Sequence, residues 1–381
     1  GGLGNGTNIT RPSPVDVFGL TSAVSAISTG YLHSCALTTS GGVKCWGAND
    51  QGQLGDGTSL DKNKPGDVSG LTSGVLAISA SYNHTCAVTS IGGVKCWGAN
   101  DLGQLGDGTT LQSLTPVDVA GLSDVSAVSA GLSFTCALTT SGAVKCWGNN
   151  GNGELGDGTN TDSLVPVEVS GLSGVTDFSA NTDHTCAVAG GGAKCWGANT
   201  YGQLGDSTRL SRNTPVDVTG LTSGIATISA GRFHSCALSA SGSVSCWGYN
   251  NWGELGNGTL ISSNTPVAVT GLPAGIIKIS SGGKHSCALT ADGTGKCWGS
   301  NSSGELGNGK FTNSSIPVTV VLTTPIPFKK ISPASRSINQ ARPVISWNAL
   351  DGVNVVTVYE YCYDTTNDNK CAAWLSNGRS T

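Results

Sequence analysis

The chain has 381 residues, only 12% of them charged, and its formal net charge is −4. The charged share is about half of the roughly 25% found in average soluble proteins. Because no basic stripe is present, composition argues against a nucleic-acid partner. The sequence contains no run of about 18 apolar residues, which would be needed to predict a membrane span. The chain contains no methionine and starts at Gly1 inside a recurring motif, so we expect a processed piece of a longer precursor.

A unit of about 50 residues recurs along most of the chain. In the second unit, residues 75–79 form a short segment with β-branched side chains, which predicts a strand. Residues 84–88 and 94–97 flank a Gly-Gly turn typical of a hairpin. Residues 116–119, Pro-Val-Asp-Val, then predict a strand that begins with proline, where a missing N–H is tolerated. Four short strands per unit are what one blade of a β-propeller needs. A Trp-Gly dipeptide marks each copy, at Trp46, Trp97, Trp147, Trp196, Trp247 and Trp298.

The 14 cysteines fall into local pairs with no odd residue left. Zinc and thioredoxin-like motifs need the spacing Cys-x-x-Cys, which is absent from the sequence. Each pair instead flanks a hairpin turn, where opposed strands bring side chains close enough for a disulfide. In the first unit, pairing Cys35 with Cys45 also places Leu37 opposite Val43. We therefore predict an oxidising compartment and the disulfides Cys35–Cys45, Cys86–Cys96, Cys136–Cys146, Cys186–Cys195, Cys236–Cys246, Cys287–Cys297 and Cys362–Cys371.

The motif Gly-x-x-His-[Ser/Thr]-Cys-Ala-Leu, followed by Val-x-Cys-Trp-Gly-x-Asn and Gly-[Gln/Glu]-Leu-Gly, resembles the repeat of the regulator of chromosome condensation family. It is most similar to the cysteine-paired version in secreted and surface proteins of bacteria. The resemblance covers residues 1–333 and implies an all-β, seven-bladed propeller, here with six complete repeats and an incomplete seventh. Periodicity alone allows six to eight blades.

The landmarks of the repeat disagree in number. Leu-Gly occurs seven times, from Leu3 to Leu306, whereas the cysteine hairpin occurs six times before residue 300. An incomplete blade exposes strand edges. Residues preceding Gly1 in the precursor, the C-terminal tail or a neighbouring molecule are the three candidates for closing it.

The tail, residues 334–381, differs from the repeat. It reads as a strand, an Asp-Gly turn and a long strand, and it resembles part of a fibronectin type III module, although about 40 residues are too few for that sandwich. We expect a β-strand extension whose candidate assembly strands contain Val344, Ile345, Trp347, Val355, Val356, Val358 and Tyr359.

Residues present in every copy are interpreted as scaffold. Five units carry a histidine before the first cysteine and the third carries Phe134, which cannot bind a metal, so we expect histidines hydrogen-bonded to nearby backbone. Asp or Asn in Leu-Gly-[Asp/Asn]-Gly is interpreted as a turn residue, with calcium binding as the weaker alternative. We predict no catalytic residues, no metal site and no cofactor.

Function is expected where the copies differ, in loops on a rigid scaffold. The candidate interaction residues are Asp61, Lys62, Arg209, Arg212, Tyr201, Tyr249 and Trp252. Asparagines in the sequons at Asn5, Asn8, Asn83, Asn257, Asn301 and Asn313 could carry glycans in a host with that machinery.

The leading hypothesis is a non-enzymatic, extracellular, bacterial structural or adhesive protein that binds copies of itself through the incomplete blade and the tail. The alternative is a secreted protein-binding module, such as an inhibitor, that uses the loops of one propeller face. Guanine-nucleotide exchange, the family's nuclear role, is disfavoured by the seven predicted disulfides.

Overall fold

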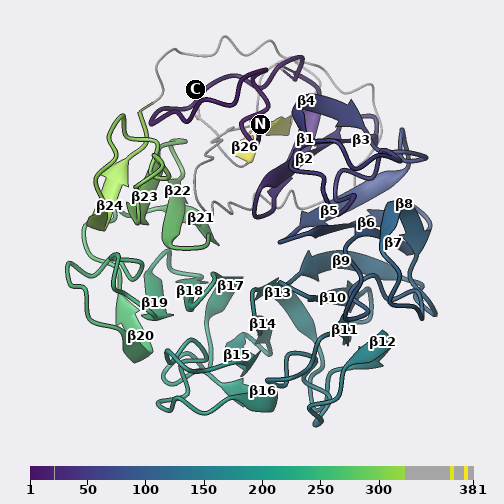
Figure 1. The fold of residues 1–381 in the computed structure, drawn as a ribbon. Coiled ribbons are helices and arrows are strands. Elements are labelled where there is room, and N and C mark those ends of the chain that lie inside the picture. Colours follow the sequence, from purple (N-terminus) through teal and green to yellow (C-terminus); the bar gives the residue numbers. More distant parts are fainter. Residues whose placement is uncertain (21, 322–360, 364–372, 376–381) are drawn as a thin grey trace.

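A computed structural model describes residues 1–20, 22–321, 361–363 and 373–375. Six four-stranded antiparallel sheets stand around a ring, and within each sheet every strand pairs with its neighbour in the chain (Figure 1). We call these sheets blade 1 to blade 6 in chain order. The described residues contain no helix, and none of them forms a helical membrane span.

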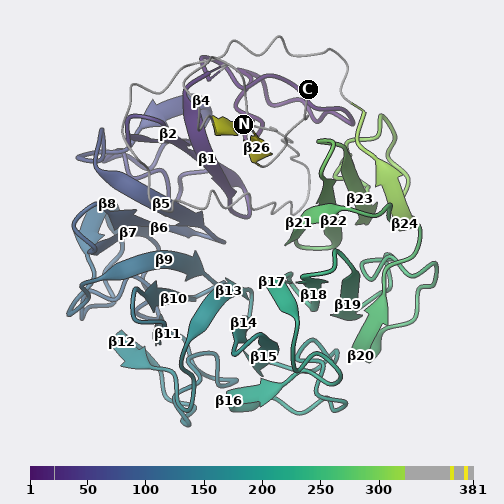
Figure 2. The same ribbon diagram turned by 180° about the vertical axis from the view of Figure 1, so that it is seen from behind.

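In each blade the four strands lie side by side in chain order, with the first strand nearest the ring centre and the fourth at the outside (Figure 2). Blades 1 to 3 comprise β1 Val24–Thr29, β2 His33–Thr38, β3 Val43–Gly47 and β4 Lys62–Asp67; β5 Val75–Ala80, β6 His84–Thr89, β7 Val94–Gly98 and β8 Ser113–Asp118; β9 Val125–Ala130, β10 Phe134–Thr139, β11 Val144–Gly148 and β12 Ser163–Glu168. Blades 4 to 6 comprise β13 Val175–Asn181, β14 His184–Ala189, β15 Gly192–Gly197 and β16 Arg212–Asp217; β17 Ile225–Ala230, β18 His234–Ser239, β19 Val244–Gly248 and β20 Ser263–Ala268; β21 Ile276–Ser281, β22 His285–Thr290, β23 Gly295–Gly299 and β24 Ser314–Thr319.

The predicted seven blades are wrong: the described residues form six complete sheets. The all-β propeller class itself is confirmed. The number seven came from the family resemblance, and the count of seven Leu-Gly motifs agreed with it. Six of these motifs lie in the connection between the third and fourth strands of a blade. Leu54 lies between β3 and β4, and Leu306 between β23 and β24, whereas Leu3 precedes β1. The number of cysteine hairpins, six, gives the number of blades.

The cysteine hairpin forms the second and third strands of each blade. In blade 1, Cys35 lies opposite Cys45 and Leu37 opposite Val43, which is the predicted register. Disulfides join the two strands in all six blades. Each bridge closes a short loop inside one blade, so the disulfides stabilise single blades and do not link one blade to the next.

The fourth strand is the outer edge of each blade, and its proline lies inside the strand and not at its start as predicted. In blade 2, β8 pairs with β7 through Ser113, Val117 and Asp118, and the pairing is irregular between them. Pro116 falls within this irregular stretch, where the missing N–H costs no ladder hydrogen bond. Val119 directly after β8 is buried, so the strand ends by returning the chain to the core.

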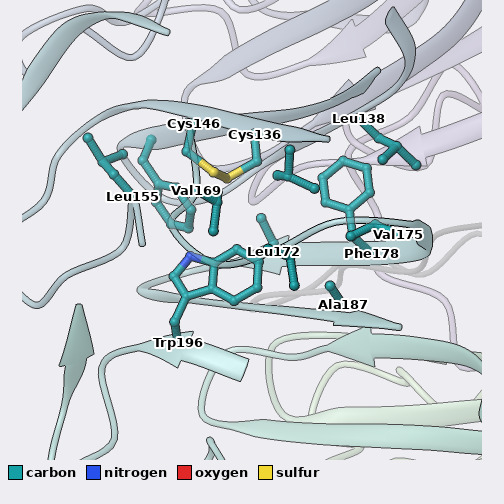
Figure 3. Close-up of a cluster of buried hydrophobic side chains, with 13 residues drawn as sticks. Cys136, Leu138, Cys146, Leu155, Val169, Leu172, Val175, Phe178, Ala187 and Trp196 are labelled. Carbon is teal, nitrogen blue, oxygen red and sulfur yellow. A yellow bond between two sulfur atoms is a disulfide. The ribbon is translucent and has the colours of Figure 1, made fainter. Parts of the chain in front are cut away.

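The hydrophobic core lies between adjacent blades and not within one sheet. Between blades 3 and 4, Cys136, Leu155 and Val169 of blade 3 pack against Phe178 and Trp196 of blade 4 (Figure 3). The five equivalent interfaces between consecutive blades each contain a tryptophan of the later blade, and all five of those tryptophans are 0% exposed. The Trp-Gly dipeptide is therefore the anchor that joins each blade to the one before it.

Residues 1–20 close the ring between blade 6 and blade 1. Leu3, Val17 and Leu20 pack against Trp46 of blade 1, whose Nε1 donates a 2.8 Å hydrogen bond to the carbonyl of Gly2. On the other side, the Gly309 N–H of blade 6 donates to the carbonyl of Pro12 at 2.9 Å. We call residues 1–20 the closing segment. None of its residues is in a strand.

The described part of the tail is one short antiparallel pair, β25 Tyr361–Tyr363 with β26 Ala373–Leu375. The predicted strands with Val344, Ile345, Trp347, Val355, Val356, Val358 and Tyr359 lie outside the described residues. The same holds for Cys371, and with it for the predicted bridge to Cys362, and for the resemblance to a fibronectin module.

Candidate functional site

Two connections of every blade reach the same face of the ring. The four strands of a blade are antiparallel and follow one another in the chain. The chain therefore turns on one side of the ring between the first and second strands, and on that same side again between the third and fourth. We call this side the loop face. All seven candidate interaction residues lie in the second of these connections or at the start of the strand that follows it.

A buried asparagine gives the longer connection the same shape in each blade. In blade 1, Asn49 is 0% exposed, its Oδ1 accepts the N–H of Leu54 at 2.9 Å, and its Nδ2 donates to the carbonyl of Thr58 at 2.9 Å. Asp56 forms the predicted turn, since its Oδ1 accepts both the N–H and the hydroxyl of Thr58. Our sequence interpretation did not single out Asn49, although an Asn follows every Trp-Gly dipeptide. Its equivalents are Asn100, Asn150, Asn199, Asn250 and Asn301.

Four of the predicted interaction residues are charged, and three of them are held within their own connection. Asp61 accepts the backbone N–H of Asn49 at 2.8 Å. Lys62 forms an ion pair with Asp56. In blade 4, Arg212 pairs with the corresponding Asp206, with both Nε and Nη2 at 2.9 Å from Oδ2.

These ion pairs have a clear electrostatic consequence. Hydrogen bonds from Lys62 and Thr58 outweigh the effect of burial and lower the pKa of Asp56. Hydrogen bonds from Thr208 and Arg212 do the same for the pKa of Asp206. Both carboxylates are therefore ionised at neutral pH, and both cations are neutralised locally. The fourth charged residue, Arg209, is exposed.

The predicted aromatic residues of blades 4 and 5 come together on the loop face. Tyr201 and Tyr249 pack edge to face with ring centroids 4.9 Å apart. Phe233, from the connection between β17 and β18, joins them at 5.0 Å from Tyr201 and 6.3 Å from Tyr249. At the position of Tyr249 the other blades carry Ala48, Ala99, Asn149, Ala198 and Ser300.

Two cationic side chains lie over aromatic rings of the loop face. The guanidinium of Arg232 is 4.9 Å from the Phe233 ring centroid. The ammonium of Lys284 in blade 6 is 5.6 Å from the ring of Trp252, a predicted residue that is 41% exposed. We call these six residues the aromatic sector: Tyr201, Arg232, Phe233, Tyr249, Trp252 and Lys284.

Arg232, Phe233 and Lys284 were missed by sequence reasoning. They occupy the two variable positions of the Gly-x-x-His motif, which was interpreted as scaffold. Comparing only these positions would have revealed them, because the six blades carry Tyr31-Leu32, Tyr82-Asn83, Leu132-Ser133, Thr182-Asp183, Arg232-Phe233 and Gly283-Lys284 there.

Two carboxyl groups beneath the aromatic sector have weakened acidity. Burial raises the pKa of Glu254 to about 7, although its Oε2 accepts the N–H of Trp252 at 2.9 Å. Burial also raises the pKa of Asp183, against the opposing charge of Arg232. Burial therefore disfavours the charged form of both carboxyl groups beside the cations Arg232 and Lys284.

The repeated histidines belong to the scaffold, but their partner is not the backbone. His84 Nε2 lies 2.9 Å from the hydroxyl of Thr135 in the next blade. Thr135 donates its only hydroxyl proton to the carbonyl of Gln104, so Nε2 of His84 must be the donor. The same carbonyl accepts Nε1–H of Trp147, so one acceptor connects the His84–Thr135 pair to the tryptophan of the blade interface. Equivalent bonds join His33 to Thr85, His184 to Ser235 and His234 to Ser286.

The described residues show no group of three or more His, Cys, Asp or Glu side chains placed to bind a metal ion. The histidines of blades 1, 2, 4 and 5 each contact the blade that follows, so they do not converge on one ion. Asp56 and Asp206 are occupied by turn hydrogen bonds and by a cation.

Residues 1–339 match the model of the RCC1-like domain. The chain belongs to this family. The RCC1-like chain is 34% identical over 326 residues to the ultraviolet-B receptor UVR8 of Arabidopsis thaliana, covering 84% of this chain and 63% of the receptor. It is 40% identical over 124 residues to the human E3 ubiquitin-protein ligase HERC2, covering 32% of this chain and 3% of the ligase. The chain thus spans less than two thirds of the length of both relatives.

Solved RCC1-like structures share the fold. Human WBSCR16 aligns with a TM-score of 0.70 and 25% identity over 78% of this chain and 82% of its own. Yeast RCC1 (Prp20), solved in complex with Kap60, aligns with a TM-score of 0.68 and 25% identity over 78% of this chain and 74% of its own. The predicted family is confirmed.

Proposed function

We propose that this RCC1-like chain is a non-catalytic protein-binding propeller that contacts its partner with the aromatic sector of the loop face. The observation that carries this proposal is the departure of blades 4 to 6 from the repeat. Tyr249 replaces the Ala or other small residue of the remaining blades, and Trp252 projects into solvent. Tyr, Trp and Arg are the residues that most often dominate binding energy at protein interfaces.

The surrounding architecture supports the same function. The six residues of the aromatic sector come from three blades, so the rigid ring holds them in place before a partner arrives, which lowers the entropy lost on binding. The yeast RCC1 complex with Kap60 supports protein binding as a use of this fold.

The test uses replacements taken from other blades, which the fold already accommodates. The triple variant Tyr201→Asn, Tyr249→Ala, Trp252→Ser copies Asn152, Ala48 and Ser303. Wild type and variant are immobilised and exposed to proteins of the native host, and the affinity of the retained partner is measured. We expect at least about a hundredfold loss, since two hot-spot side chains contribute about 2 kcal/mol or more each.

A matched control is Leu111→Ser, which removes a 72% exposed apolar side chain from the connection of blade 2. This variant should bind like wild type. A partner that the triple variant binds as well as wild type, or that Leu111→Ser also releases, would contradict the use of the aromatic sector.

We propose, as a second candidate, an extracellular structural or adhesive role with self-association at the seam between blades 6 and 1. The six disulfides support an oxidising location outside the cytoplasm. The seam supports self-association because the closing segment has a Pro-Val-Asp-Val sequence at residues 14–17 but forms no strand, and an unpaired strand-forming segment can pair with another chain.

Negative-stain electron microscopy of the non-reduced protein, together with its mass by light scattering, tests this second role. Rings joined into chains or fibres support self-association. Separate rings with the mass of one chain at all concentrations would exclude it and leave the protein-binding role standing.

A further inference from the structure

The two cations of the aromatic sector differ from five other cations of the described chain in having no acidic partner. Lys44, Lys62, Lys95, Lys194 and Arg212 each form an ion pair with an aspartate. Neither Arg232 nor Lys284 forms an ion pair of 4 Å or shorter with any described carboxylate. Each is held over an aromatic ring instead.

The nearest acidic groups do not replace such a partner. Asp183 and Glu254 act on Arg232 and Lys284 only through their electrostatic field, and burial raises the pKa of both carboxyl groups. Glu254 also directs one oxygen to the N–H of Trp252. The guanidinium and the ammonium therefore keep hydrogen-bond donors available to a ligand in a chain whose net charge is −4.

The rings favour a peptide over a carbohydrate. Tyr201 and Tyr249 pack at 74°, Phe233 and Tyr249 at 71°, and Tyr201 and Phe233 at 49°. These three rings therefore offer no continuous flat platform on which a sugar ring could stack. Half-buried rings beside cations instead suit apolar side chains flanked by carboxylates.

We propose that the aromatic sector binds an acidic segment of a partner protein, with carboxylates at Arg232 and Lys284 and apolar side chains against Tyr201, Tyr249 and Trp252. This inference rests on the proposed protein-binding function and names the chemistry of the partner. Carboxylates form charge-assisted hydrogen bonds with both cations, and the guanidinium can bind one in a bidentate manner.

The probe is a fluorescent peptide that alternates Asp and Glu with Leu and Trp, and its matched control carries Asn and Gln in place of the acids. Affinities for the intact protein are measured by fluorescence anisotropy at low and high salt. We expect the acidic peptide to bind about tenfold to a hundredfold tighter than the amide peptide at low salt, and the difference to shrink as salt screens it.

The double variant Arg232→Gln, Lys284→Gln should remove this preference, whereas Lys95→Gln, which breaks a surface ion pair with Asp118 in blade 2, should retain it. Circular dichroism before the titrations checks that each variant is folded. Equal affinity for both peptides, a preference that survives in the double variant, or binding of heparin but not of the acidic peptide would overturn the proposal.

The outcome is separable from that of the proposed function. If the acidic peptide shows no preference while the triple aromatic variant still loses its natural partner, only the acidic chemistry fails. If the triple variant keeps its partner, the protein-binding role of the sector fails as well.

Discussion

Lowering the pH from 7 to 5 is expected to remove about 2 kcal/mol from the free energy of unfolding for each buried histidine, and about 9 kcal/mol for all five. Burial lowers the pKa of His33, His184 and His234 to about 3 and that of His84 and His285 to about 4. The unfolded histidines titrate near 6.5, so between these values the unfolded chain binds more protons than the folded one. The stabilisation is complete above the unfolded pKa and is lost as the pH falls toward the folded pKa values of about 4 and about 3.

The structural cause lies in the second ring nitrogen. Nε2 of His84 donates to Thr135, whereas the buried Nδ1 of His33, His84, His184 and His285 has no hydrogen-bond partner. Protonation would place a charge and an unsatisfied N–H in an apolar interface, which is strongly unfavourable.

Urea unfolding of the non-reduced protein at a series of pH values measures this effect. At the position of His84, blade 3 has the buried Phe134, so His84→Phe introduces a residue that the fold accommodates. This variant should reduce the pH dependence of the free energy of unfolding by about one fifth, since each histidine contributes one proton. Asn83→Ser, which copies Ser133, changes no titrating group and serves as the control. An unchanged pH dependence in His84→Phe would show that the histidines are not its source.

Trp147→Ala should cost about 3–5 kcal/mol of folding free energy, the range for a buried aromatic residue replaced by alanine. The indole is 0% exposed between blades 2 and 3, packs against Leu105 and Val119 and donates a hydrogen bond to the carbonyl of Gln104. Its removal leaves a cavity and takes away one of the two hydrogen bonds that this carbonyl accepts.

Two further tryptophans make this prediction specific. Trp252→Ala, at 41% exposure, should cost less than about 1 kcal/mol. The loss of folding free energy for Trp46→Ala should lie between those of the other two variants, because Trp46 packs against the closing segment in a smaller apolar cluster. Midpoints of urea unfolding compare the three variants; equal losses for Trp147→Ala and Trp252→Ala would contradict the interblade location of the core.

The local parts of the fold follow from sequence, because their signals lie close together in the chain. The hairpin of blade 1 has the predicted register, with Leu37 opposite Val43, since the turn and the paired cysteines fix it within eleven residues. The number of blades could not be predicted from the sequence, because Leu3 belongs to the same Leu-Gly motif as Leu54 but no hairpin precedes Leu3 in the chain.

The candidate site was predictable only in part. Tyr201, Tyr249 and Trp252 stand out as aromatic residues in variable loops, but the chain does not reveal that Phe233 of a different connection completes the cluster. Lys62 and Arg212 looked available for binding, yet each neutralises an aspartate six residues away. The first contact joins different connections of the chain, and the second depends on how one connection folds back on itself.

The closing segment also sets the order in which the molecule can fold. Five of the six junctions join blades that are neighbours in the chain, so they can form as short stretches of polypeptide become available. The sixth requires Pro12 to meet Gly309 across nearly the whole propeller. Until then, a nascent chain is an open arc of finished blades, and the circle is complete only after the last blade has been made.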